Sequence, residues 1–376
     1  MEKKRMIRYI MAAGVMLGGL DKLLGNRWGY GRKMEEGFLL LGPTALSMVG
    51  IICLVPLFSY VLRVPSNILY QFAGVDPGMF GGVFAIDMGG YQISAELAKN
   101  TQIGVYAGII VSSTLGCTIF FTIPVGLGMA GEEVNMEFLR GMMFGLLALP
   151  VALVLGGFCC GLNFEQILKQ NIGVFLFIGI ILTGLLKYPK RIEKGFFAIA
   201  CFMKIAGTVG LVVGAVYSLC EIKLLPLTAS IEEAMEVVAS IGIAMVGSLP
   251  AAEFIRRRLE KLERLRSWSG LDATGMAGLL VGTVSVIPVL VMLKDMNERS
   301  RVINAAFLVC AASTFGAHLG FTMKAEPTMV NPMIAAKIAG GISALILAEA
   351  VMRRRKQCCS CRRKHPGSRN RRTDCQ

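Results

Sequence analysis

The feature that most constrains this chain is a series of long segments without a charged residue. Six such segments cover residues 37–62, 103–131, 141–164, 170–186, 273–293 and 302–323. Each has close to or more than the roughly 20 residues that a helix needs to cross about 30 Å of hydrocarbon. Their hydrophobicity does not alternate as in the strands of a membrane barrel. The sequence therefore predicts an all-α, polytopic membrane protein with about 10–11 transmembrane or re-entrant helices.

Composition and charge exclude several classes of protein. Only 17% of the 376 residues are charged and 54% are hydrophobic, which is too little charge for a soluble surface. The net charge of +14 is concentrated in 256–266 and beyond residue 353. Basic runs beside spans mostly mark the cytoplasmic side, so we predict a lipid bilayer as partner and no nucleic acid. No P-loop, HExxH or GxSxG motif is present, and we predict neither an enzyme nor a cofactor.

The basic tail carries Cys358, Cys359, Cys361 and Cys375 and is predicted to be disordered. Together with His365 these cysteines fit no standard zinc spacing, so no metal site is predicted. Lipidation and reduced thiols are the alternatives for them. Two GxxxG spacings, at 141–145 and 210–214, predict close helix packing. A homo-oligomer stays an open alternative.

The two halves of the chain resemble each other at a spacing near 200 residues. The matched pairs are Glu35-Glu36 with Glu232-Glu233, 45–50 with 242–247, 74–76 with 270–272, and 113–122 with 313–322. Similarity in the same order indicates duplication, and duplicated helical bundles are a common transporter plan. The predicted organisation is a first helical repeat over 1–169, a connector over 170–194, a second repeat over 195–352 and the tail over 353–376.

The charge rule leaves the topology open. The basic run 256–266 and the basic tail should both be cytoplasmic, yet three hydrophobic segments lie between them. One of the three is therefore predicted to be re-entrant, with 273–293 the leading candidate. Whether the repeats run parallel or inverted depends on that point.

Asp87 is the one charged residue in the bilayer-length segment 77–95. A carboxylate at that depth costs roughly 2.5–3.5 kcal/mol on insertion scales, and such residues usually face a cavity or a partner. Gly89 and Gly90 would let a ligand approach the backbone closely. We predict that Asp87 is a counter-ion for a cationic solute or a ligand for a coupling ion. The alternatives are a helix cap or a salt bridge to Lys204.

Two further residues could contribute to such a site. His318, the only histidine outside the tail, could relay protons or bond a solute. Its alternative is a neutral histidine bonded to a nearby carbonyl. Tyr91 could offer its ring to an ammonium group within about 6 Å, although aromatic residues in spans more often pack or anchor at the interface.

Several motifs resemble those of a known family. They include 34–38 (Met-Glu-Glu-Gly-Phe), 87–91 (Asp-Met-Gly-Gly-Tyr), 121–125 (Phe-Thr-Ile-Pro-Val), 301–304 (Arg-Val-Ile-Asn) and 318–321 (His-Leu-Gly-Phe). The chain resembles the EutH family, the ethanolamine permeases of ethanolamine-utilisation operons, from about Asp21 to about Met352. The resemblance implies passage of a small protonated amino-alcohol across the bacterial inner membrane. Asp87 would then neutralise the ammonium, and Asn304 or His318 would bond the hydroxyl.

Two positions depart from the family pattern. Ala317 stands where the family has an aspartate before His-Leu-Gly-Phe, and Ser285-Val286 stand where polar asparagines are expected. Both changes fall in the second repeat and remove polar groups. Another small amine or organic cation as the solute is therefore one alternative. A membrane scaffold for a metabolic assembly, which transports nothing, is the other.

Overall fold

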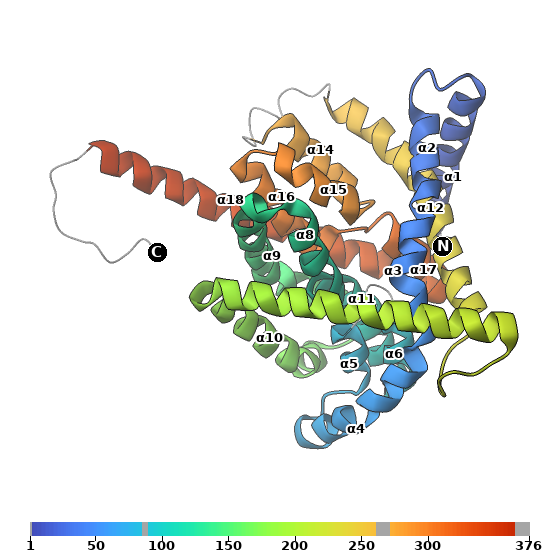
Figure 1. Cartoon of the computed structure of the whole chain (residues 1–376). Helices are drawn as coiled ribbons and strands as arrows, with labels where there is room; N and C mark the ends of the chain where they lie inside the picture. Colours follow the sequence, from blue (N-terminus) through green and yellow to red (C-terminus); the bar gives the residue numbers. More distant parts are fainter. Residues whose placement is uncertain (1, 85–88, 261–270, 365–376) are drawn as a thin grey trace.

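The computed structural model describes residues 2–84, 89–260 and 271–364, and its regular elements within these ranges are all helices. This confirms the all-α prediction (Figure 1). Six helical stretches of the described chain are long and apolar enough to cross a membrane, judged by length and composition. They are Thr101–Met129, Glu133–Cys159, Phe164–Lys187, Lys190–Cys220, Ile231–Ile255 and Pro327–Arg353.

Most of these stretches coincide with single helices, namely α9 (Glu132–Cys159), α10 (Phe164–Lys187), α11 (Pro189–Cys220), α12 (Ile231–Glu260) and α18 (Val330–Lys364). The first stretch is composite. It runs through α7 (Thr101–Tyr106), the π-helices η2 (Ala107–Gly116) and η3 (Thr118–Thr122), and α8 (Ile123–Ala130). All ten residues of η2 are buried, so this segment forms the centre of the core.

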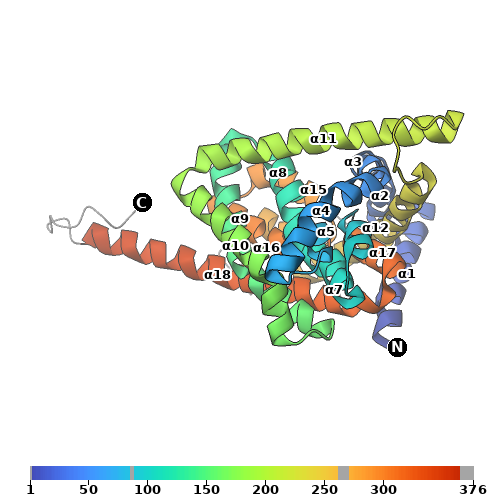
Figure 2. The same cartoon turned by 90° about the horizontal axis from the view of Figure 1, so that it is seen from below.

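Helices on either side of this core make two groups. Helix α16 (Glu298–Ala311) packs against both α9 and α18. Helix α12 packs along α1 (Glu2–Leu23), α2 (Tyr30–Leu39) and α3 (Leu41–Cys53). Helix α11 crosses the outside of the molecule and contacts α3 and α8 (Figures 1 and 2).

The two GxxxG spacings lie at the closest of these helix contacts. A methyl group at Gly141 or Gly145 of α9 would overlap the backbone of α16. A methyl group at Gly210 of α11 would overlap the backbone of α3 at Gly50, and one at Gly214 would press on Cys53. The predicted close packing is confirmed, because only glycine lets these backbones approach so far.

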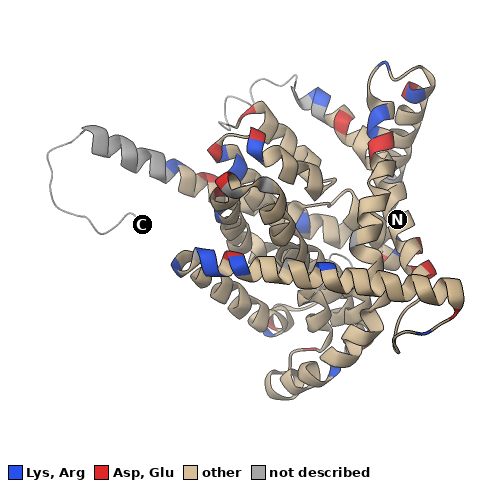
Figure 3. Cartoon of the chain, viewed as in Figure 1, with Lys and Arg blue, Asp and Glu red and all other residues tan. Residues whose placement is uncertain are grey.

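The charged residues lie mainly at helix ends and in connecting segments, and the long helices are uncharged over most of their length (Figure 3). Lys204 is an exception within α11, where its side chain is exposed. It is therefore not the buried base that was considered as a partner for Asp87. An exposed position in an apolar helix suits a lysine whose stem lies along the helix surface.

Asp76 closes a first interrupted hairpin. Helices α5 (Gly78–Val83) and α6 (Gly90–Leu97) have only 6 and 8 residues, too few to span a bilayer. The Asp76 carboxylate accepts the backbone N–H of Gly78 at 2.8 Å, at the start of α5, and that of Asn100 at 2.9 Å, just after α6. One side chain thus joins the entrance of the hairpin to its exit.

Asp272 closes a second hairpin in the same way. Helices α14 (Ala273–Gly282) and α15 (Val286–Met292) have 10 and 7 residues. The Asp272 carboxylate accepts the N–H of Gly275 at 2.6 Å, in the first turn of α14, and that of Asn297 at 2.6 Å, beyond α15. The segment therefore begins and ends at the same place.

Both apolar segments are broken. The segments 77–95 and 273–293 each contain glycine or proline residues within an apolar run, and each folds as a pair of short helices. Glycine propagates a helix poorly, at a cost of about 1 kcal/mol relative to alanine, and the 77–95 segment contains five glycines. The aspartates then bond the backbone groups at the hairpin ends.

Two more uncharged segments are interrupted. The segment 302–323 divides into α16 and α17 (Ala317–Ala325), and Ser313 between them has φ +53°. The segment 37–62 divides among α2, α3 and α4 (Val55–Ala73), with Pro56 at the start of α4. The chain also forms two short 3-10 helical turns, η4 (Leu293–Asp295) and η5 (Pro327–Met329).

The predicted tail begins inside a helix. Helix α18 continues to Lys364, so residues 353–364 are helical where a disordered segment is expected. Residues 365–376, with His365 and Cys375, lie outside the described residues. Helix α10 covers most of the predicted connector, and its Gln170 side chain accepts the N–H of Asp76 at 2.7 Å. The connector is thus bonded to the first hairpin.

Removing either hairpin-closing carboxylate should destabilise the protein. Asp76→Ala and Asp272→Ala each leave backbone N–H groups without their charged acceptor, and we expect each to lower the free energy of unfolding by about 2 kcal/mol. Thermal unfolding of the purified protein in detergent measures this. Asp295→Ala, which removes an exposed carboxylate of η4, is the control and should change stability by less than about 0.5 kcal/mol. Equal stability of all three variants would contradict the closing role.

A second substitution tests the packing at the break in 302–323. A methyl group at Gly316 would overlap the backbone carbonyl of Val284, so Gly316→Ala should lower the free energy of unfolding by about 1–3 kcal/mol. Gly173→Ala is the matched control, because nothing lies within 4 Å of its added methyl group. The control should be neutral or more stable. The same thermal assay compares them, and a Gly316→Ala protein as stable as the control refutes the predicted contact.

Candidate functional site

The second hairpin and the broken helix beside it meet at their non-helical residues. The N–H of Ser313 donates to the carbonyl of Gly282 at 2.8 Å, and the N–H of Phe315 donates to the carbonyl of Thr283 at 2.7 Å. Gly316 packs directly against the carbonyl of Val284. These residues form an irregular strip of backbone, which we call the junction (residues 282–285 and 312–316).

The junction lies inside the protein. Ser285 and Thr314 are buried, with 4% and 0% of their surfaces exposed, and the Ser248 hydroxyl of α12 donates to the carbonyl of Phe315. Non-helical backbone at membrane depth is tolerated only where protein buries it or where it lines a water-filled cavity. The junction therefore has the two properties expected of a transporter site, a broken backbone and a protein surrounding.

The repeat predicted from the sequence pairs part of the junction with η2. The residues that the sequence repeat pairs with Ser313 and Thr314 are Ser113 and Thr114, and both are buried in this π-helix. Helices α5 and α6 pack against η2, as the α14–α15 hairpin packs against α16. π-Helical segments are rare and occur frequently at functional sites. Irregular backbone thus occurs both at the junction and at the positions that the predicted repeat pairs with it.

Of the residues predicted from sequence, Asp87 lies outside the described residues. Gly89 and Gly90 are buried at the start of α6. Gly89 has φ −61°, and the atom nearest to an added methyl group is a side-chain carbon of Ile51 at 3.8 Å. Neither its backbone conformation nor a close contact among the described residues requires glycine at this position.

Tyr91 of α6 contacts α17, the helix that carries His318. The Tyr91 ring packs edge-on against Phe321, with 5.7 Å between ring centroids, and its hydroxyl lies 3.5 Å from the carbonyl of Ala325. His318 is fully buried one turn before Phe321, and its backbone N–H donates to the carbonyl of Ser313 at 3.2 Å. Tyr91 from the first half therefore contacts the helix that carries His318 in the second half.

Asn304 is engaged in helix packing. Its amide nitrogen donates to the carbonyls of Gly275 at 3.0 Å and Ser300 at 2.9 Å, which joins α16 to α14. Its amide oxygen is buried and has no hydrogen-bond partner among the described residues. An added methyl group at Gly278 would lie 2.5 Å from that oxygen. The structure therefore gives Asn304 a structural role and leaves one acceptor unused.

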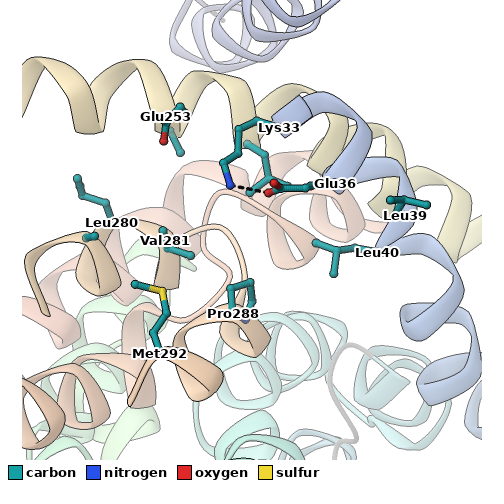
Figure 4. A pocket seen from close by; sticks show the side chains of 12 residues that line it. Lys33, Glu36, Leu39, Leu40, Glu253, Leu280, Val281, Pro288 and Met292 are labelled. Carbon is teal, nitrogen blue, oxygen red and sulfur yellow. Dashed lines mark hydrogen bonds and ion pairs between the residues drawn. The ribbon is translucent and has the colours of Figure 1, made fainter. Parts of the chain in front are cut away.

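A cavity of about 500 Å³ lies between α2, α12 and the α14–α15 hairpin (Figure 4). Glu36 of α2 and Glu253 of α12 line it. Glu36 pairs with Lys33 at 2.6 Å, and Glu253 pairs with Arg257 at 2.6 Å. A smaller cavity of about 290 Å³ shares Ala252 and Leu280 with it and reaches Thr283, Val284 and Phe315 of the junction.

The sequence analysis assigns no site role to three charged residues. Glu36 appears there only in the repeat and in a family motif, and Glu253 is not singled out. Lys337 of α18 also went unnoticed, although it is fully buried and donates to the carbonyl of Ser113 at 2.6 Å. The signal was present, because Lys337 interrupts the uncharged run 327–348 much as Asp87 interrupts 77–95.

The two departures from the family pattern lie at the junction. Ser285 follows Val284, and Ala317 follows Gly316, which packs against Val284. Two positions that are 32 residues apart in the sequence (285 and 317) therefore each lie next in the chain to a residue of the Val284–Gly316 contact.

Comparison with known proteins places the chain in a family. The model of the family described as "Ethanolamine utilisation protein, EutH" matches residues 4–351. A protein of Listeria monocytogenes named "Probable ethanolamine permease EutH" is 35% identical over 362 residues, covering 95% of this chain and 97% of the relative. Its namesake in Salmonella typhimurium is 30% identical and covers 91% and 94% of the two chains.

A Bacillus subtilis relative, named "Uncharacterized protein YxeR", is 36% identical and covers 90% of this chain and 92% of its own length. No solved structure matches the fold. The family match extends over nearly the whole chain and the apolar helices give it several membrane crossings. The chain is a multi-pass bacterial membrane protein and belongs to the EutH family of ethanolamine utilisation proteins.

Proposed function

We propose that this chain transports a small protonated amine, with ethanolamine as the first candidate, across the bacterial inner membrane. The observation that carries the proposal is the buried junction of irregular backbone, which has a matched irregular segment in η2 of the other half. Broken helices facing each other near the centre of a bundle are the usual architecture of a transported-ion site. The names of the Listeria and Salmonella relatives support ethanolamine as the solute.

The site itself is proposed to lie between two duplicated halves. Asp76 and Asp272 close their hairpins through the same kind of bonds, and each reaches the cap residue of the next helix, Asn100 or Asn297. Both asparagines accept N–H groups from that helix. This agreement of hydrogen-bonding pattern supports the two-repeat organisation, with the solute held where the repeats meet.

Within this site the proposed roles follow from chemistry. Asp87 neutralises the ammonium group, and Gly89 and Gly90 leave the adjoining backbone free of side chains. Tyr91, held against Phe321, forms part of the wall. The unused oxygen of Asn304 accepts the solute hydroxyl if the solute reaches α16, and His318 provides a second polar group beside the junction.

The solute is proposed to approach through the two adjoining cavities. The larger is lined by the Lys33–Glu36 pair and by Glu253, and the smaller ends at the junction. Ala252 and Leu280, which both cavities share, would then form the narrow point between entrance and site.

A second candidate keeps transport and changes the solute. Ala317 and Ser285 remove polar groups that the family resemblance leads us to expect, and each follows a residue of the Val284–Gly316 contact. A site with fewer polar groups favours a small amine without a second hydrogen-bonding group. The same uptake experiment distinguishes the two candidates.

Uptake of labelled ethanolamine into vesicles tests the proposal directly. Asp87→Asn and Asp87→Ala remove the counter-charge, and we expect uptake to fall by about tenfold or more, equivalent to about 1.4 kcal/mol of lost binding. Asp295→Asn, which neutralises an exposed carboxylate, is the control and should keep full uptake.

Each other result has a definite meaning. Equal uptake by wild type and both Asp87 variants removes Asp87 from the mechanism. Uptake of another amine but not of ethanolamine contradicts ethanolamine as the solute and still supports a transport function. A folded wild-type protein that carries no amine at all supports the membrane-scaffold alternative.

His318 is tested by the pH dependence of uptake. Histidine changes charge between about pH 5 and 8, so a proton-relay role makes uptake depend on pH in that window. We expect His318→Gln to flatten this dependence while uptake at its best pH changes less. Initial rates across the pH range measure it, with Tyr188→Phe, an exposed aromatic position, as control. A variant with the wild-type profile leaves His318 a structural residue.

A further inference from the structure

Lys337 is a buried cation that the proposed function does not use. None of its surface is exposed, and its Nζ donates to the carbonyl of Ser113 at 2.6 Å. It lies seven residues after the start of α18 at Val330, about 10 Å along the helix. Ionisable residues inside membrane segments are rare and usually mark a solute or ion pathway.

Close packing surrounds the lysine. One turn further along α18, a methyl group at Gly340 would lie 2.8 Å from the Cys310 sulfur of α16, and one at Gly341 would press on Ala311 at 2.7 Å. Ala336, its neighbour, is also fully buried. The side chain therefore points into the contact between α18, α16 and η2, and not along the helix towards a membrane surface.

The contact has the chemistry of an ammonium site. The lysine head group is a primary ammonium on a methylene carbon, and its acceptor is a backbone carbonyl in the π-helix that the sequence repeat pairs with the junction. A small primary amine presents the same head group. Backbone carbonyls of irregular segments are the usual ligands for cations at transporter midplanes.

We propose that the carbonyl of Ser113 belongs to an ammonium-binding position of the transport core, and that Lys337 is its resident occupant. The inference rests on the proposed function and deepens it by naming the solute class. A mobile primary amine takes this position when the Lys337 head group leaves it. Two ammonium groups cannot occupy one carbonyl site together, because like charges repel strongly in a medium of low dielectric constant.

This assignment sets a rule for specificity. The bond is an N–H···O=C hydrogen bond, so a competing cation must carry N–H donors. Primary ammonium ions have three, whereas a quaternary ammonium ion has none. The site therefore selects primary amines over quaternary ones, for a reason separate from charge.

Competition on the wild-type protein tests the rule. The purified protein in detergent binds labelled ethanolamine, and propylamine or tetramethylammonium is added as competitor. Displacement by propylamine, with at least tenfold weaker displacement by tetramethylammonium, is expected. Equal displacement by both cations overturns the proposal. If ethanolamine itself does not bind, propylamine and tetramethylammonium are compared by how far each raises the unfolding temperature of the protein. A failure of ethanolamine as the solute is thereby distinguished from a failure of this inference.

Variants of the lysine provide the second test. Lys337→Met removes the charge and keeps the length, and it should lower the Kd of propylamine at least fivefold by freeing the Ser113 carbonyl. Lys337→Arg keeps a charged occupant and should not lower it. Lys204→Met, at an exposed lysine of α11, is the control and should bind as wild type does. A Lys337→Met protein that binds no more tightly than wild type overturns the proposal, and if this variant does not fold the competition result decides alone.

Discussion

The structure depends on one constraint, that every backbone N–H and C=O group inside a membrane must find a partner within the protein. Continuous helices such as α9 and α12 meet it by their own hydrogen bonds. The broken segments cannot, and their free groups are bonded by side chains and by one another. Asp76 and Asp272 bond the ends of the two hairpins. At the junction, Ser313 and Phe315 bond the backbone of the α14–α15 break.

This constraint explains why the polar residues gather where they do. A break is stable only where other protein surrounds it, so the breaks lie in the core beside η2, α16 and α17. The same places collect the buried polar groups, Thr314, His318 and Lys337, because free backbone carbonyls and N–H groups are available there as partners. Fold stability and a polar site in an apolar core therefore have a common origin.

The glycine pattern shows how the helices come close enough to build this core. Gly141 and Gly145 let α9 touch the backbone of α16, and Gly340 and Gly341 let α18 pack closely against the side chains of Cys310 and Ala311 in α16. Without a hydrophobic driving force between helices in lipid, such close packing supplies much of the association. Lys337 is buried because this packing leaves no route from α18 to the membrane surface.

Part of the fold could be predicted from the sequence, because the formation of a helix depends mainly on the residues within it. Hydropathy predicted the helices, and GxxxG spacing predicted close helix packing, which the structure shows between α9 and α16 and between α11 and α3. The uncharged run 302–323 gave no warning of its break, because Ser313 and Gly316 are ordinary residues in an apolar helix. Lys337 stood out in the sequence as clearly as Asp87 did, but its significance depends on a partner 224 positions away at Ser113.

The sequence by itself therefore determined the helical class, the membrane setting and the family. Each of these follows from residue type and spacing along the chain, because the hydrophobicity and length of a segment determine whether it lies in lipid or in water. Only the tertiary structure decided that Asp76 and Asp272 close hairpins, that Asn304 joins two helices, and that Gly316 packs against Val284. These are contacts between distant residues, and the free energy that selects them comes from packing and hydrogen bonds that exist only once the chain has folded.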